Sequence, residues 1–218
     1  MPDAPTVVCF DLGGVIVRIC RSWEEGVAAA GLDLRSAEVT PNSIDAKTDL
    51  VRGITDGSLP LEEFFAALSS GVGGLYTPDE FRAVHMSWIL GEYDGVGSVV
   101  DDLNAVEGVR TACLSNTNAL HWEQLGGGAF PAFDALAHRH ASHLLNSAKP
   151  DPAIYAEFEA RLGASGADIL FFDDLPENIE TALARGWRAV RVDHESETAP
   201  QIRTALREHG VLAQAETP

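Results

Sequence analysis

The sequence predicts an α/β fold in which a parallel sheet lies between two layers of helices and carries an inserted helical unit. Short apolar runs of the kind that form buried parallel strands alternate with helix-like stretches over much of the chain. One long segment near the N-terminus breaks this alternation and contains only helix-like stretches. The 218 residues are enough for one such core with a small insertion.

Four apolar runs are predicted to be strands of the sheet. The first of them, VVCFD, ends in Asp11 and is followed by the glycine pair Gly13 and Gly14. Continuous apolar runs suit central parallel strands, because helices cover both faces of such strands. The predicted strands are residues 7–11, 109–114, 169–172 and 189–192.

Helices are predicted between these strands. Pro152 and Pro176 stand where the first turn of a helix tolerates proline, and Gly163 and Gly186 follow the predicted helix ends. The predicted core helices are residues 97–106, 118–125, 152–162 and 176–185. Strands that alternate with helices at this spacing indicate a three-layer, Rossmann-like sheet.

Residues 17–95 are predicted to form an all-helical cap domain, which leaves a core domain of residues 1–16 plus 96–218. The segment has no clear parallel strand, and its predicted helices are residues 22–30, 43–52, 61–69 and 78–90. An insertion directly after the first strand lies at the carboxyl edge of the sheet, where open α/β folds bind their ligands.

Composition restricts the partners and the surroundings of the protein. The formal net charge of -18 argues against nucleic acid and anionic membranes as partners, because both attract basic surfaces. No apolar run approaches the roughly 20 residues that cross a bilayer, and the N-terminal MPDAPTVV lacks the basic start of a secretory signal. The three scattered cysteines indicate neither a disulfide framework nor a zinc site. We therefore expect a cytoplasmic protein, either a monomer or a homodimer.

Four short polar segments stand at predicted strand ends or before a helix. They are FDLGGV with Asp11, LSNTN with Ser115 and Asn116, AKPDPAIY with Lys149, and FFDDLPEN with Asp173 and Asp174. All strands of a parallel sheet end at the same edge, so these segments are expected to converge on one pocket.

The residue types in this pocket suit phosphoryl transfer. A carboxylate at the tip of a strand can attack phosphorus. Mg²⁺ prefers oxygen ligands and relieves the repulsion between Asp11, Asp174 and an incoming phosphate. Lys149 supplies positive charge, and Ser115 can donate a hydrogen bond to a developing oxyanion. The backbone N–H groups of the Gly13–Gly14 turn can hold phosphate oxygens.

In this order and at this spacing, the four segments resemble the four motifs of the haloacid dehalogenase (HAD) superfamily, and the insertion resembles its cap. The likeness spans nearly the whole chain. More narrowly, FDLGGVIV, LSNTNALH, KPDPAIY and FFDDLPENI resemble the branch that contains bacterial α-D-glucose-1-phosphate phosphatases and the N-terminal phosphatase domain of epoxide hydrolases. The resemblance implies a Mg²⁺-dependent phosphatase of small phosphorylated metabolites, with sugar phosphates as one candidate class.

The resemblance also implies the nucleophile and the metal ligands. Asp11 would attack phosphorus and contact the metal. The backbone carbonyl of Gly13 and the carboxylate of Asp174 would be further Mg²⁺ ligands, and Asp173 would be either another ligand or a group behind the ligands. Asn178 stands where many relatives have an acid that holds metal-bound water.

The remaining roles implied by the resemblance concern the phosphoryl group. Ser115 and Asn116 would orient it, with Gly14 beside them, and Lys149 would pair with both Asp11 and the phosphate.

Gly13 departs from the common phosphatase pattern, which has a second Asp at this position. That Asp protonates the leaving group and then activates water, and general acid–base catalysis typically contributes about 10²- to 10⁴-fold in rate. The branch named above can also carry Gly here. Two hypotheses therefore stay open: a phosphatase, or a degenerate member that binds a phosphate ligand or a partner protein with little turnover.

Other readings are less favoured. Haloacid dehalogenases lack the paired acids that FFDD provides here. A phosphonatase would need Lys47 to form a Schiff base with its substrate, but a surface lysine is the simpler interpretation of Lys47. His138, His140 and His143 are interpreted as edge-strand or loop histidines rather than metal ligands, because nothing completes a ligand set. His121, Trp88 and Tyr93 are candidates for lining the substrate cleft.

Overall fold

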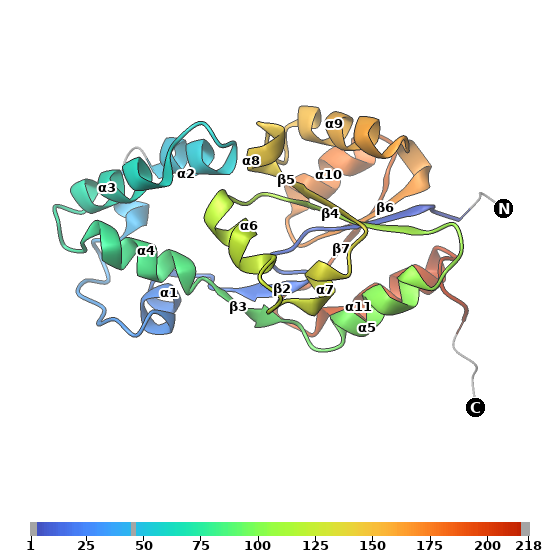
Figure 1. The fold of residues 1–218 in the computed structure, drawn as a ribbon, viewed down its shortest axis with the longest axis horizontal. Helices are drawn as coiled ribbons and strands as arrows, with labels where there is room; N and C mark the ends of the chain where they lie inside the picture. The colour runs from blue at the N-terminus through green and yellow to red at the C-terminus, as the bar shows by residue number, and fades with distance from the viewer. Residues whose placement is uncertain (1–3, 45–46, 215–218) are drawn as a thin grey trace.

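The computed structural model describes residues 4–44 and 47–214, and it contains a parallel sheet flanked by helices with a helical cap beside it (Figure 1). All pairs in the five-stranded sheet are parallel, and the strand order is β5-β4-β1-β6-β7. The strands are β1 (Val7–Phe10), β4 (Arg110–Ser115), β5 (His138–Ala141), β6 (Ile169–Asp173) and β7 (Arg188–Arg191). The four predicted strands agree with β1, β4, β6 and β7 to within one residue at each end.

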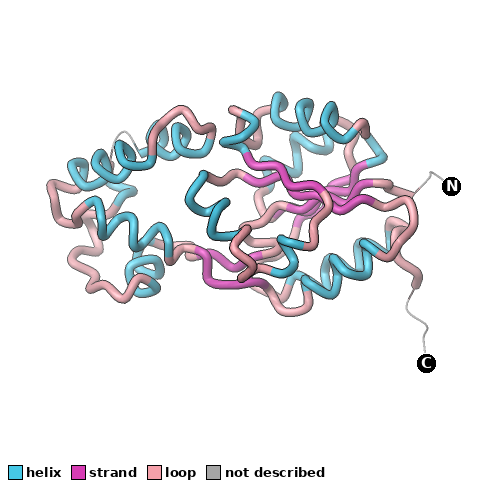
Figure 2. Tube along the Cα trace, viewed as in Figure 1, coloured by secondary structure: helices cyan, strands magenta, loops and turns pink. Residues whose placement is uncertain are grey.

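Helices cover both faces of the sheet, which confirms the predicted three layers (Figure 2). Val8 and Phe10 of β1 belong to a core cluster with α5 (Val96–Asn104) and α11 (Thr198–Glu208). Val7 and Cys9 belong to the cluster on the opposite face, with α9 (Pro152–Leu162) and α10 (Pro176–Ala184). Successive side chains of a strand point to opposite faces, so a wholly apolar strand is buried on both sides.

Short elements complete the core. They are α6 (Ala119–Leu125), α7 (Pro131–Asp134), α8 (Ser142–Leu145) and η2 (Gly166–Asp168). The side chain of Asn118 caps α6 by accepting from two backbone N–H groups, and Asp151 caps α9 just before Pro152. Gly163 ends α9 with a φ of 59°, a left-handed conformation that glycine adopts without strain.

The cap has a hydrophobic core of its own. Its helices are α1 (Trp23–Ala29), η1 (Pro41–Ser43), α2 (Lys47–Thr55), α3 (Leu61–Gly71) and α4 (Pro78–Met86). The ring of Trp23 lies 5.1 Å from that of Tyr76 and 5.2 Å from that of Phe81, between centroids. Of the predicted helix 43–52, residues 45–46 lie outside the described residues, and Ser43 belongs to η1.

One part of the predicted cap differs in the structure. The helix predicted over 78–90 ends at Met86, and β3 (Ile89–Glu92) pairs antiparallel with β2 (Val17–Ile19). This ribbon connects the cap helices with the core (Figure 1). A four-residue strand stabilised by a partner about 70 residues away leaves little local signal, since sheet pairing depends on the partner strand. The division into residues 1–16 plus 96–218 and residues 17–95 stays a prediction.

Two further observations bear on the sequence analysis. Within the described ranges 4–44 and 47–214, no helix combines the length and the apolar character that a membrane crossing needs. Cys9, Cys20 and Cys113 are all buried and carry free thiols.

Candidate active site

Three carboxylates meet at the carboxyl edge of the sheet. Asp11 follows β1 directly, Asp173 ends β6, and Asp174 comes next. Each offers an oxygen that lies within 4.8 Å of an oxygen of the other two, and all three residues are buried. The backbone N–H of Asp11 donates to the carbonyl of Phe172 at 2.8 Å, so the two neighbouring strands hold the carboxylates together.

Lys149 joins two of these acids. Its Nζ lies 3.0 Å from Oδ1 of Asp11 and 2.7 Å from Oδ2 of Asp173, and the residue is buried in the loop before α9. The side chain of Asn116 holds this loop, because its Nδ2 donates to the Lys149 carbonyl at 2.7 Å and its Oδ1 accepts from the Lys149 N–H at 2.8 Å. The end of β4 therefore positions the lysine.

Burial and charge shape the ionisation of this pair. Burial raises the pKa of Asp11 to about 6, although the Lys149 ammonium opposes the shift. Burial by itself lowers the pKa of Lys149, but the carboxylates of Asp11 and Asp173 outweigh it and hold that pKa above its ordinary value. Lys149 is therefore a permanent positive charge beside a carboxylate that is mostly ionised at neutral pH.

Asp173 and Asp174 have different surroundings. Both oxygens of Asp173 accept from Nδ2 of Asn178 at 3.0 Å, its Oδ1 also accepts from the Leu175 N–H, and its Oδ2 contacts Lys149. Asp174 instead pairs through Oδ2 with Nη1 of Arg21 at 2.9 Å and with Nδ1 of His194 at 3.2 Å. Asp173 is thus saturated by fixed donors.

Arg21 and His194 are site residues that the sequence analysis missed. Arg21 comes two residues after β2, and His194 comes three residues after β7. The carbonyl of His194 accepts from the hydroxyl of Tyr93 at 2.7 Å, which fixes this loop against the end of the ribbon. His194 could have been predicted as a site residue from its position soon after a predicted parallel strand. No pattern in the sequence relates Arg21 to Asp174.

The residues fit a hard divalent cation. Oδ1 of Asp11 and Oδ2 of Asp174 are buried and accept no hydrogen bond from the described part of the protein, and their only polar contacts there are ion pairs. Three carboxylates face one lysine and one arginine, so the site keeps a negative balance even before a phosphate arrives. An all-oxygen set with spare acceptor capacity is the donor chemistry that Mg²⁺ prefers.

Gly14 makes room for this arrangement. A Cβ at this position would lie 2.4 Å from Nη2 of Arg21 and 2.5 Å from Oδ2 of Asp174, and the φ of 83° also favours glycine. The Gly14 N–H donates to the carbonyl of Val17 at 2.8 Å. This amide therefore stabilises the turn, and what Gly14 offers a ligand is space.

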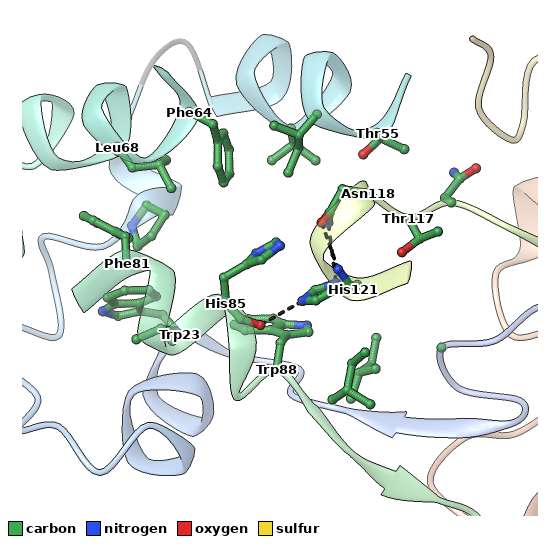
Figure 3. Close-up of a pocket in the computed structure, with 18 of the residues that line it drawn as sticks. Trp23, Thr55, Phe64, Leu68, Phe81, His85, Trp88, Thr117, Asn118 and His121 are labelled. Atoms are coloured by element: carbon green, nitrogen blue, oxygen red, sulfur yellow. Dashed lines mark hydrogen bonds between the residues drawn. The ribbon is translucent and has the colours of Figure 1, made fainter. Parts of the chain in front are cut away.

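A cavity of about 440 Å³ lies between this edge of the core and the cap. Gly13, Ser115 and Asn116 line its core end, and Ser115 is buried at the end of β4. His121 and Trp88 line it, as the sequence analysis considered (Figure 3). Tyr93 is buried elsewhere, with its hydroxyl on His194.

The remaining histidines do not form a metal site in the described part of the chain. His138 and His140 lie on β5, an edge strand, and the His140 ring packs on Phe158 with centroids 5.1 Å apart. His143 contacts the carbonyl of Thr117 through Nδ1 at 3.2 Å. Within residues 4–44 and 47–214, Asp11, Asp173 and Asp174 are the group of ligand-type residues close enough to share an ion.

This fold and site define a hydrolase with a Rossmann-like core and a helical cap. The family model described as haloacid dehalogenase-like hydrolase matches residues 5–186. Because the match covers most of the chain, the protein belongs to this family.

Individual relatives agree with this assignment. Phosphatase MT3486 of Mycobacterium tuberculosis is 33% identical over 161 residues, which are 73% of each chain. The structure of a predicted HAD-like family hydrolase from Porphyromonas gingivalis has a TM-score of 0.75 at 23% identity, and the match covers 94% of this chain and 99% of that one. A HAD family enzyme from Bacteroides thetaiotaomicron, solved in complex with magnesium and inorganic phosphate, has a TM-score of 0.73 at 21% identity and covers 91% and 100%. At these identities the two structures show the fold alone.

Proposed function

We propose that this hydrolase is a Mg²⁺-dependent phosphomonoesterase that acts on a small phosphorylated metabolite through a phosphorylated Asp11. The observation that carries the proposal is the contact of Lys149 with both Asp11 and Asp173, beside Asp174. The name of the mycobacterial relative and the magnesium and phosphate bound to the Bacteroides enzyme support it.

The reaction divides into two displacements. An oxygen of Asp11 attacks phosphorus, the bond between phosphorus and the ester oxygen breaks, and the departing oxygen takes a proton from water, since Gly13 offers no acid. Water then attacks the aspartyl-phosphate, which returns the carboxylate and releases inorganic phosphate. Lys149 keeps its positive charge beside the attacking oxygen throughout.

The other residues hold the reacting groups. Asp11, the carbonyl of Gly13 and Asp174 would bind Mg²⁺, which neutralises charge on the phosphoryl oxygens when it is bound. Asp173, itself fixed by Asn178, orients Lys149. Ser115 donates to a phosphoryl oxygen, and Asn116 acts through the Lys149 loop that it holds. The cap selects the alcohol part of the substrate.

The test is a panel of phosphorylated metabolites, including sugar phosphates, assayed with Mg²⁺ and with chelator. Asp11→Asn keeps the shape of the side chain and removes the nucleophile, so we expect its turnover to fall to background. Asp101→Asn, an exposed acid on α5, is the matched control and keeps wild-type turnover. Equal turnover by wild type and Asp11→Asn contradicts the nucleophile assignment.

The alternative is a degenerate family member that binds a phosphate ligand with little turnover, and binding and turnover assays distinguish it from an enzyme. A binding protein of this kind would take up orthovanadate or beryllofluoride, both phosphoryl mimics, in a Mg²⁺- and Asp11-dependent way while consuming no ester in the panel. Uptake of the mimics together with turnover supports the enzyme.

A further inference from the structure

The walls of the cavity are mainly apolar. Large hydrophobic side chains from α1, α3, α4 and the segment that follows α4 line the cap half, as the close-up shows (Figure 3). They include Trp23, Phe64, Phe65, Leu68, Phe81 and Trp88. Its volume lies within the range of about 300–1,000 Å³ of typical small-molecule sites. Such walls favour an apolar ligand, because burying hydrocarbon is favourable and burying unpaired polar groups is not.

The polar groups near the centre of the cavity bond mainly to one another. The rings of His85 and His121 stack with centroids 3.9 Å apart and an interplanar angle of 7°. Nε2 of His121 lies 2.7 Å from the His85 carbonyl, and Nδ1 of His121 lies 3.5 Å from Nδ2 of Asn118 (Figure 3). Nε2 of His85 is buried and has no hydrogen-bond partner in the described residues. Nε1 of Trp23, another lining residue, is buried and unpartnered in the same way, so these two ring nitrogens are the polar groups that a ligand can satisfy.

This stack carries no charge at neutral pH. Burial lowers the pKa of His85 to about 3, and the neighbouring His121 adds to the shift. Burial also lowers the pKa of His121. The middle of the cavity is therefore neutral.

Arg21 and Lys47 are the permanent cations among the described residues that line the cavity. Arg21 pairs with Asp174 at the core end, and the Lys47 ammonium donates to the Asn42 side chain. The Asn42 amide is neutral, so Lys47 keeps its positive charge and is the cation among the described lining residues that a second negative group of the ligand could use. If the alcohol part of the ligand carried many hydroxyls, most of them would lie against the aromatic walls without hydrogen-bond partners, which disfavours binding.

We propose that the alcohol part of the substrate is a mainly hydrocarbon group that fills this cavity, with the phosphate at the end formed by Gly13, Ser115 and Asn116. Nε2 of His85 and Nε1 of Trp23 can each hold one polar oxygen of that group. The proposal rests on the proposed phosphatase function and specifies its substrate class.

The test compares esters of primary alcohols, so that the leaving group stays nearly constant. Straight-chain alkyl monophosphates from methyl to octyl are assayed with Mg²⁺ beside glucose 6-phosphate. We expect kcat/KM to rise about three- to fourfold for each added methylene until the cavity is full. A value for glucose 6-phosphate that equals or exceeds that for octyl phosphate overturns the proposal.

A matched pair of variants links this preference to the cavity. Val51 on α2 lines the cavity and is 40% exposed, so it lies where the cavity opens. Leu34 is a cap residue outside the lining and is 44% exposed. We expect Val51→Asp to lower the ratio of octyl to methyl phosphate kcat/KM about tenfold, and Leu34→Asp to keep the wild-type ratio. Both positions are exposed enough to accept a charge, and thermal unfolding checks that each variant folds.

Failure of the substrate class is distinguishable from failure of the function. Asp11-dependent hydrolysis with no dependence on chain length keeps the phosphatase and overturns the hydrocarbon substrate. If no ester is hydrolysed, calorimetry of the same alkyl phosphates on wild type with Mg²⁺ decides. Affinity that grows with chain length supports the hydrocarbon site, and affinity that stays flat overturns it.

Discussion

Asp173 and Asp174 are adjacent acids with different tasks in the proposed site. Asp173 is saturated by Asn178, Leu175 and Lys149, whereas the buried Oδ2 of Asp174 accepts no hydrogen bond from the described residues and faces Arg21 and the His194 ring. The contacts favour Asp174 as the direct metal ligand and Asp173 as the group that orients Lys149. From the sequence alone, Asp173 could be either a metal ligand or a group behind the ligands.

This difference predicts which substitution weakens Mg²⁺ binding. We expect Asp174→Asn to lower Mg²⁺ affinity at least tenfold in calorimetric titrations, because a ligand charge is lost. Asp173→Asn lowers turnover through Lys149 and changes Mg²⁺ affinity less. Asp101→Asn serves as the control for the loss of one acid. A larger loss of Mg²⁺ affinity in Asp173→Asn would reverse the assignment.

Gly13 allows a gain-of-function experiment. Its φ lies outside the left-handed region, and the three heavy atoms nearest to a Cβ there all belong to Ile19, with Cδ1 closest at 3.0 Å. Gly13→Asp combined with Ile19→Val, which deletes that methyl, therefore adds an acid with little strain. We expect kcat/KM for an alkyl phosphate to rise at least tenfold, because a poor leaving group benefits most from a proton donor.

Two comparisons control the Gly13 experiment. Ile19→Val alone should leave the rate for alkyl phosphate near the wild-type value. 4-Nitrophenyl phosphate, whose leaving group needs no proton, should gain little from the double variant. An equal gain for both substrates would argue against a role in general acid catalysis.

The pKa of His85 predicts how stability depends on pH. The folded pKa of about 3 lies below the unfolded value of about 6.5, so the unfolded chain binds a proton first as the pH falls. His85, which faces His121 and Arg82, therefore lowers the free energy of unfolding by roughly 2 kcal/mol between pH 7.5 and 5. The loss begins near pH 6.5 and would end near pH 3.

Denaturant unfolding at pH 7.5 and pH 5 measures this contribution. His85→Gln should unfold with a smaller difference between the two pH values than wild type does. His138→Gln, on the edge strand β5, removes a histidine elsewhere and should keep the wild-type difference. An unchanged difference in His85→Gln contradicts the assignment of a neutral, buried imidazole.

At the scale of single elements, we expect two helices to respond in opposite ways to the same substitution, glycine to alanine. A Cβ on Gly26 of α1 would lie 2.7 Å from Cζ3 of Trp88 and 2.9 Å from Cγ1 of Val84. A Cβ on Gly97 of α5 would have no heavy atom from elsewhere in the described residues within 4 Å. Helix propensity favours alanine over glycine by about 1 kcal/mol, whereas overpacking costs about 1–3 kcal/mol.

We therefore expect Gly97→Ala to raise the free energy of unfolding by up to about 1 kcal/mol and Gly26→Ala to lower it. Chemical denaturation of the two variants beside wild type checks the signs. If Gly26→Ala instead stabilised the protein, the Trp88 side chain would have to shift to make room for the new methyl group. The part of the cavity wall that Trp88 forms could then change its shape.

The ribbon of β2 and β3 is the element that ties the cap to the core. Arg18 of β2 donates to the Glu92 carbonyl at 2.8 Å, lies over the Tyr93 ring at 4.4 Å and pairs with Glu197 just before α11. Arg21, directly beyond the ribbon, contacts Asp174. The ribbon therefore connects the cap to the core and also positions Arg21, one of the charged residues of the candidate active site.

At the scale of the whole molecule, the net charge of -18 acts on stability. Self-repulsion destabilises the compact state, and the Debye length shrinks from about 30 Å at 0.01 M salt to about 8 Å at 0.15 M. We expect the Tm to rise over this range of NaCl in the absence of Mg²⁺. Choline chloride should raise it equally, since screening does not depend on the cation. A rise with NaCl alone would indicate a bound sodium ion instead.

The sequence by itself determined the layered core and the convergence of the acids. Apolar runs and helix boundaries are local patterns, and they predicted β1, β4, β6 and β7 with the helices between them. A general property of parallel sheets, that all strands end at one edge, then brought Asp11, Lys149 and the acidic pair together. Resemblance to the HAD motifs gave the family, which the comparison with known families confirmed.

Only the tertiary structure decided the contacts between residues far apart in the chain. The β2–β3 ribbon, the pairing of Arg21 and His194 with Asp174, and the stack of His85 on His121 all join segments that no local pattern relates. The apolar cavity arises in the same way, from cap helices that face the end of the sheet. Local periodicity reports which face of an element is buried, but it does not report which partner covers that face. The hydrolase family is therefore readable from the sequence, and the proposed substrate class from the folded chain.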